Sequence, residues 1–262
     1  MRFLALIFTL LCTPLAAQDR VEVDVELFLA VDVSRSMQPF ELEIQRRGYA
    51  TALASSEVQA AISGGPLGQI ALTYVEWAGA FDQRVIVPWT LVSTPADAQR
   101  IADTLTARFD DGLRRTSISA ALTHAAASIE GNRYAGLRRV IDISGDGPNN
   151  MGAGVTEARD QVLAQGITIN GLPLMTRDDS LFSRWDIPDL DAYYTACVIG
   201  GPGAFVVPVT DWAEFEDAVR RKLVLEIGAL PERVYRAQAT GPYNCRIGEE
   251  IWERNRDLFA LP

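Results

Sequence analysis

An aspartate and two serines at alternate positions follow the first apolar segment of the mature part of this 262-residue chain. Asp32, Ser34 and Ser36 come directly after the apolar run 27–31. A run this short and this apolar is typical of a strand buried on both faces of a parallel sheet. Ligand sites of open α/β sheets form where such strands end, and these oxygen-bearing side chains suit Mg²⁺, Mn²⁺ or Ca²⁺ better than zinc. The segment therefore predicts part of a divalent cation site.

Two later segments carry side chains of the same kind. Thr116 follows the loop 110–115 and opens an expected helix over 116–129. Asp146 follows the apolar strand expected over 139–144. Both positions fit the pattern of oxygen-bearing side chains that begins at Asp32, and both are candidates for the missing ligands of the cation site.

The elements that must position these side chains alternate between strands and helices. We expect strands over 27–31, 69–77, 83–87, 139–144, 167–172 and 204–209, and helices over 39–61, 95–109, 116–129, 154–165, 190–197 and 211–227. The short connection between the second and third strands predicts a hairpin. The chain therefore predicts a doubly wound, mostly parallel six-stranded α/β sheet with one antiparallel edge strand and helices on both faces.

Residues 1–17 have the organisation of a secretory signal peptide. Arg2 precedes the apolar stretch 3–11, and small residues stand before Gln18, where we expect cleavage. The apolar stretch is shorter than the ~20 residues that span a bilayer. We therefore expect a periplasmic or extracellular protein without a membrane span after cleavage. Lipidation of Cys12 is an alternative, although the residues before it lack the small side chain that such processing favours.

The remaining chain predicts one domain over 18–230 and a polar extension over 231–262 that packs back on it. After cleavage the cysteines are Cys197 and Cys245. A cysteine pair in an exported protein is more often a disulfide than a redox or metal pair, and this one would add about 4 kcal/mol of stability. The net charge of −10 makes nucleic acids and anionic membrane surfaces unsuitable partners.

Three features together resemble the von Willebrand factor A domain: Asp-x-Ser-x-Ser after the first strand, a threonine opening a middle helix, and Asp-Gly after the fourth strand. The resemblance covers about residues 21–227, and within that family the chain is similar to a bacterial exported branch of unknown function. The family's signature is a metal-ion-dependent adhesion site. The resemblance implies that the metal ligands, some of them acting through water, are Asp32, Ser34, Ser36, Thr116 and Asp146. It also implies that an open position on the ion takes an Asp or Glu from a partner protein.

The chain departs from the family pattern at two places. Arg114 and Arg115 stand where two glycines commonly precede the threonine, and Gly145 stands where a threonine commonly precedes the last Asp-Gly. The arginines are either a solvated loop or a bidentate clamp for an acidic partner.

Other polar residues in the expected elements have two interpretations. Asp142 and Glu76 lie inside apolar strands, so each needs a partner and is either hydrogen-bonded scaffold or support for the cation site. The motif at Asp32 taken alone is also compatible with a helix-capping turn. His124, the only histidine, lies in an alanine-rich helix, and we expect its side chain to pack in the protein interior.

Three functions compete. A Mg²⁺-dependent phosphohydrolase of haloacid-dehalogenase type would use Asp32 as nucleophile, but the second acid it needs is Ser34 here, and Lys222 follows the last motif instead of preceding it. A metal-free structural interaction domain is the other alternative. The sequence favours a non-enzymatic binding module that captures a partner carboxylate through a Mg²⁺-type ion.

Overall fold

The structure, a computed structural model, describes residues 20–108, 112–176, 187–228 and 243–256. Within these residues five strands form one sheet in the order β3-β2-β1-β4-β5. The strands are β1 (Val21–Asp32), β2 (Ile70–Trp77), β3 (Gln83–Val92), β4 (Tyr134–Gly145) and β5 (Thr168–Pro173). All neighbours are parallel except β2 and β3, which pair antiparallel. The expected α/β class, the parallel order and the antiparallel edge strand are confirmed.

The expectation of a sixth strand over 204–209 is wrong. This segment runs beside β5 but pairs with it only through isolated bridges, Gly171 with Val206 and Leu174 with Val209. Val207 and Val209 donate their N–H groups to the carbonyl oxygens of Gly171 and Pro173, but Pro173 of β5 has no backbone N–H to donate in return, so the ladder is interrupted there. The sheet therefore has five strands within the described residues, with an irregular segment along its β5 edge.

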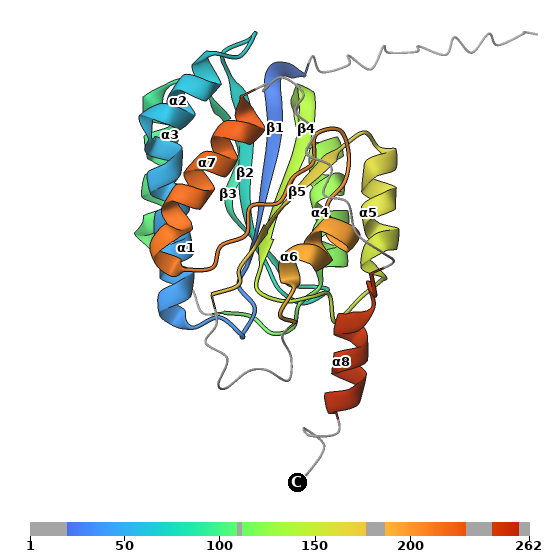
Figure 1. Ribbon diagram of the computed structural model, residues 1–262. Coiled ribbons are helices and arrows are strands. Elements are labelled where there is room, and N and C mark those ends of the chain that lie inside the picture. The colour runs from blue at the N-terminus through green and yellow to red at the C-terminus, as the bar shows by residue number, and fades with distance from the viewer. Residues whose placement is uncertain (1–19, 109–111, 177–186, 229–242, 257–262) are drawn as a thin grey trace, which may run out of the picture.

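Helices cover both faces of the sheet (Figure 1). They are α1 (Pro39–Ala54), α2 (Ser56–Ser63), α3 (Pro95–Ala107), α4 (Ile118–Gly131), α5 (Val155–Ala164), α6 (Leu190–Tyr193) with the π-helical turn η1 (Tyr194–Val198), the 3₁₀ turn η2 (Trp212–Glu214), α7 (Phe215–Ile227) and α8 (Ile247–Asn255). The single helix expected over 39–61 is two helices, because Ser55 caps α2 by accepting a hydrogen bond from the N–H of Val58.

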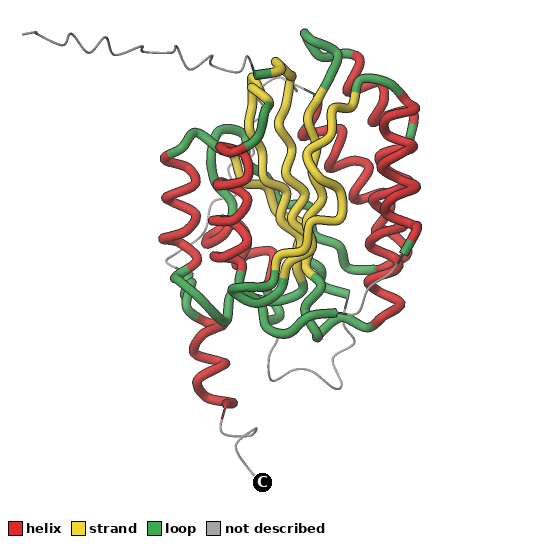
Figure 2. Tube along the Cα trace, turned by 180° about the vertical axis from the view of Figure 1, so that it is seen from behind, coloured by secondary structure: helices red, strands yellow, loops and turns green. Residues whose placement is uncertain are grey.

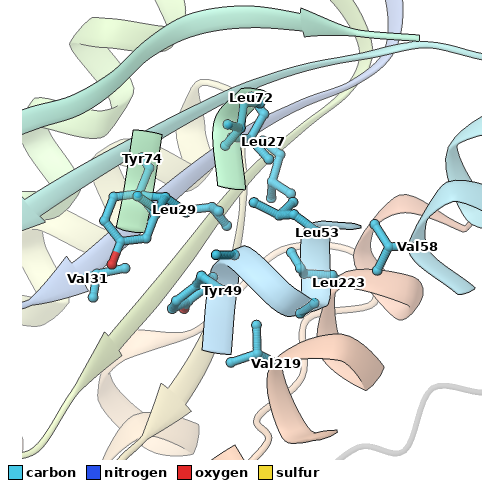
Figure 3. Packing of buried hydrophobic residues seen from close by; sticks show 14 of the residues in the cluster. Leu27, Leu29, Val31, Tyr49, Leu53, Val58, Leu72, Tyr74, Val219 and Leu223 are labelled. Carbon is cyan, nitrogen blue, oxygen red and sulfur yellow. The ribbon is translucent and has the colours of Figure 1, made fainter. Parts of the chain in front are cut away.

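The central strand β1 is buried on both faces, as its apolar sequence predicts. Successive side chains of a strand point to opposite faces, so Leu27 and Leu29 pack with α1, α2, α3 and α7, whereas Phe28 packs with α4 and α5. Figure 3 shows Leu27 and Leu29 facing Leu53 of α1 and Leu223 of α7. Each such side chain contributes about 1.5–3 kcal/mol when it is fully buried. This packing fixes the direction of β1 and the position of its carboxyl end.

The carboxyl ends of β1 and β4 lie at the same end of the molecule, which is the lower end in Figures 1 and 2. Helix α8 projects from this end in both views. The described residues contain no helix that is long and apolar enough to cross a membrane. The expected signal peptide, 1–17, lies outside the described residues.

Candidate metal site

The site begins at the last residue of β1. Asp32 is fully buried, and its Oδ1 accepts a hydrogen bond of 2.6 Å from the N–H of Ser34. The carbonyl oxygen of Asp32 accepts a bond of 3.0 Å from the side-chain amide of Gln45 on α1. These two bonds turn the chain out of the sheet and hold the carboxyl group at its edge.

A chain of hydrogen bonds joins this turn to the end of β4. The hydroxyl groups of Ser34 and Ser36 lie 2.8 Å apart, and Ser36 Oγ donates to Oδ1 of Asp146 at 2.9 Å. Ser34 and Asp146 are buried, and Ser36 is half-buried. Two segments 110 residues apart in sequence therefore present four oxygen-bearing side chains to one place.

Thr116 is placed beside this group by its backbone. Its N–H donates to Oδ1 of Asn150 at 3.1 Å, and its carbonyl oxygen accepts from the N–H of Asn150 at 2.9 Å. Asn150 belongs to the loop that starts at Asp146. The threonine is buried and precedes α4, which Ser117 caps. Among the described residues, no hydrogen bond links the Thr116 hydroxyl directly to the other four side chains, so the structure joins Thr116 to them through the loop alone.

The second oxygen of Asp32 has a vacant acceptor position. Oδ2 is buried and accepts no hydrogen bond from any residue that the structure describes. Burial, and next the negative charge of Asp146, raise the pKa of Asp32 well above its ordinary value. A buried carboxylate oxygen without a donor is costly. A cation between Asp32 and Asp146 would supply the missing partner and offset the repulsion, so these donors fit a hard divalent ion.

Tyr194, at the start of η1, lies close to this oxygen. The residues around it in the sequence do not predict this position. A β-carbon built on Gly145 would lie 2.7 Å from Oη of Tyr194 and 3.0 Å from Oδ2 of Asp32. The Tyr194 hydroxyl is buried and, within the described part of the chain, has no hydrogen-bond partner. Burial, followed by the charge of Asp32, raises the pKa of Tyr194, so the phenol keeps its proton beside the carboxylate.

Asn149 joins the loops that carry the site and is also missed by sequence reasoning. Its Oδ1 accepts from the N–H of Ser119 at 3.0 Å, and its Nδ2 donates to Oε1 of Glu249 at 2.7 Å. Its own N–H donates to the hydroxyl of Tyr193 at 3.1 Å. The only sequence signal is an Asn-Asn pair three residues after Asp146, which does not by itself indicate these partners.

Helix α8 stands beside the site and is held there by contacts to two other segments. The expected disulfide between Cys197 and Cys245 is present. Trp252 of α8 stacks on the guanidinium of Arg115, whose Cζ lies 3.3 Å from the ring centroid. Arg115 has a φ of 74°, which is uncommon outside glycine. This arginine is therefore engaged with α8 rather than free in a solvated loop.

The remaining polar candidates belong to the scaffold. Glu76 forms ion pairs with Arg46 at 2.6 Å and with Arg84 at 2.7 Å. Asp142 forms an ion pair with Lys222. His124 packs edge-on against Phe28, with 6.0 Å between the ring centroids. None of these contacts reaches the candidate metal site.

Solved structures with the same fold define the class of protein. Proximal thread matrix protein 1 from the mussel byssus superposes with a TM-score of 0.57 at 13% identity, covering 79% of this chain and 49% of that one. The pilus adhesin SpaC from Lactobacillus rhamnosus GG gives 0.57 at 12% identity, covering 80% and 31%. A von Willebrand factor type A protein from Catenulispora acidiphila gives 0.52 at 13% identity, covering 79% and 43%. The chain spans half or less of each of these proteins, and its fold is that of a von Willebrand factor A domain.

Within this class the chain belongs to the family described as protein of unknown function DUF1194, whose model matches residues 22–231. A comparison with curated proteins found no match. The resemblance expected from the motifs is thereby confirmed at the level of fold and family.

Proposed function

We propose that this chain is an exported, non-enzymatic module that binds a partner protein through a divalent cation. The observation that carries the proposal is the hydrogen-bond chain from Ser34 through Ser36 to Asp146, next to the vacant acceptor of Asp32. The proposed ligands of the ion, directly or through water, are Asp32, Ser34, Ser36, Thr116 and Asp146.

The donor set favours Mg²⁺, with Mn²⁺ or Ca²⁺ as substitutes. The described residues contain no group of three or more His, Cys, Asp or Glu side chains that could hold a metal. Two carboxylates balance the charge of a divalent ion, and where they act through water the direct ligands are neutral hydroxyls and water, which leaves an electrophilic, exchangeable position. One structure of the mussel thread matrix protein is described as having a zinc-occupied MIDAS motif, which supports divalent binding at this site of the fold.

A partner carboxylate is the ligand that best fits such an ion. Asp or Glu of a partner would complete the coordination with a charged oxygen. SpaC is described as an adhesin and the mussel protein as a matrix protein, which supports a protein partner. The net charge of −10 opposes binding to nucleic acid. The expected signal peptide supports an encounter in the periplasm or outside the cell.

Titration of the chelator-treated protein with Mg²⁺ tests the ion. Calorimetry on the wild type should give saturable binding, and Mg²⁺ should raise its melting temperature because the ion binds only the folded state. Asp32→Ala should abolish both effects while unfolding remains cooperative. Asp103→Ala removes an exposed carboxylate on α3 and should behave as wild type. Equal Mg²⁺ binding by Asp32→Ala and wild type would reject the site.

A pulldown from envelope extract tests the partner. Wild type and Asp32→Ala are each used as bait, with Mg²⁺ and with EDTA. A partner retained only by wild type in Mg²⁺ supports the proposal, and the Asp103→Ala bait should retain it as well. A partner retained equally in all conditions would support a metal-free interaction domain instead.

A further inference from the structure

Two exposed arginines stand among the proposed metal ligands. Arg35 lies between Ser34 and Ser36, and Arg114 lies two residues before Thr116. Neither arginine forms an ion pair or a side-chain hydrogen bond with any residue that the structure describes. Positive side chains repel a cation placed beside them, so these two arginines do not serve to hold the ion itself. A bound anion is the ligand that would relieve this repulsion.

The backbone brings the two arginines to neighbouring positions. The N–H of Leu113 donates to the carbonyl oxygen of Val33 at 2.7 Å, and Ser34 and Leu113 form an isolated parallel bridge. Arg35 and Arg114 are the next residues of the two segments, so they leave this bridge side by side. A guanidinium group matches the geometry of a carboxylate and binds it through two hydrogen bonds. One carboxylate placed over the bridge can therefore contact both arginines.

An exposed aromatic ring stands next to this arginine pair. Phe81, in the turn between β2 and β3, is 90% exposed, more than any other large hydrophobic residue that the structure describes. A β-carbon built on Gly79 of this turn would lie 3.0 Å from the carbonyl oxygen of Arg114. The carbonyl oxygen of Ala78 also accepts a hydrogen bond of 2.7 Å from the N–H of Ser117. Arginine and aromatic side chains side by side are typical of the central part of a protein interface.

The charge of the arginine pair contrasts with that of the whole chain, which is −10. A partner that is acidic over its entire surface would be repelled by most of this protein. A short acidic segment avoids that repulsion and meets positive charge only at the arginines and the proposed ion. Charge complementarity of this kind selects the partner and fixes how it binds.

We propose that the partner binds through a segment that carries two carboxylates close together and an apolar side chain beside them. This inference rests on the proposed function, because the first carboxylate completes the coordination of the ion. The second carboxylate lies between Arg35 and Arg114, and the apolar side chain packs on Phe81. Arg115 is not part of this contact, since its guanidinium stacks on Trp252 of α8.

Synthetic peptides on a common glycine-serine backbone test the second carboxylate. Calorimetry in Mg²⁺ compares a peptide that has one glutamate with peptides that have a second glutamate at increasing spacings. At least one of the latter should bind the wild type about fivefold more tightly, because hydrogen bonds between ionised groups are strong. Equal affinity for all peptides, in a protein that binds Mg²⁺, would overturn this inference and leave the metal site intact. A protein that does not bind Mg²⁺ would reject the proposed function itself.

Variants of the arginines identify the group that holds the second carboxylate. Arg35→Gln and Arg114→Gln should each lose most of the gain that the second glutamate gives. Both should bind Mg²⁺ at least as tightly as the wild type, because a positive charge near the ion is removed. Arg221→Gln removes an exposed arginine on α7 and should keep the gain. A gain that persists when Arg35 and Arg114 are both replaced would overturn the assignment.

Phe81→Ser tests the apolar contact. A leucine added beside the two glutamates should strengthen binding to the wild type several-fold and should have no effect on Phe81→Ser. Leu137→Ser is the control, because it removes another exposed apolar side chain, in the amino-terminal half of β4. The same effect of the leucine on the wild type and on Phe81→Ser would overturn this contact. Tighter binding of polygalacturonate, whose carboxylates are carried by sugars, than of any peptide would overturn a protein partner.

Discussion

The hydroxyl of Tyr194 occupies the space that a side chain on Gly145 would need. A β-carbon there would lie 2.7 Å from Oη of Tyr194, and it would also crowd Oδ2 of Asp32 at 3.0 Å. Members of the resembled family commonly carry threonine at the position of Gly145. In this chain a hydroxyl from η1, 49 residues further along the sequence, stands at that place beside the candidate metal site.

Gly145→Ala should lower the free energy of unfolding by about 1–3 kcal/mol, because the new methyl group overpacks the site. The Mg²⁺ affinity should also fall, since Asp32 must shift. Urea unfolding and calorimetry measure the two effects. Gly147→Ala is the control, because a β-carbon on Gly147 meets nothing within 4 Å. Equal effects of the two substitutions would contradict the proposed crowding.

Tyr194→Phe should leave the free energy of unfolding of the metal-free protein unchanged or higher, because it removes a buried hydroxyl that has no partner among the described residues. Tyr193→Phe removes the acceptor of the Asn149 N–H and should cost about 1 kcal/mol. Urea unfolding of both variants in EDTA makes the comparison. A larger loss for Tyr194→Phe would show that its hydroxyl is bonded in the folded protein.

Asn150→Ala should weaken Mg²⁺ binding several-fold, because Asn150 holds the backbone of Thr116 against the Asp146 loop. The loss of one hydrogen bond should also lower the free energy of unfolding by about 1 kcal/mol. Asn132→Ala is the matched control. Asn132 bonds Glu26 and the N–H of Tyr134 at the amino end of β4, far from the site. Calorimetry should find normal Mg²⁺ affinity in this control, and a similar loss in both variants would exclude a specific role of Asn150.

Replacing both Cys197 and Cys245 with serine should lower the melting temperature. The bridge closes a loop of 48 residues, which corresponds to about 4 kcal/mol on the chain-entropy model. The five proposed metal ligands lie outside this loop, so the Mg²⁺ affinity should be unchanged. Thermal unfolding and calorimetry measure the two quantities. An unchanged melting temperature would show that the disulfide does not stabilise the fold. A loss of Mg²⁺ affinity would show that α8 positions the site.

The sequence predicts a mostly parallel sheet with one antiparallel strand because a helix-forming segment separates most of the apolar runs, whereas only a short turn separates the second run from the third. It predicts the four side chains that meet at the sheet edge because they belong to short local motifs at strand ends. The partners Tyr194 and Asn149 could not be predicted, because their contacts join segments far apart and depend on side-chain directions. The missing sixth strand depends on Pro173 of β5, which cannot donate to the segment 204–209 although that segment itself favours a strand.

The free energy of unfolding should depend on pH through Asp97, independently of the metal site. Although partial burial acts in the opposite direction, the N–H of Ser93, the Thr94 cap and Arg100 lower the pKa of Asp97 from 3.8 to about 2. A carboxyl group with a lowered pKa in the folded state stabilises the protein above its unfolded value and loses that contribution as the pH falls. The wild type should therefore lose stability relative to Asp97→Asn as the pH falls from about 4 to about 2. Urea unfolding of both proteins across this range measures the difference, and a constant difference would show that the N-terminus of α3 does not hold the carboxylate.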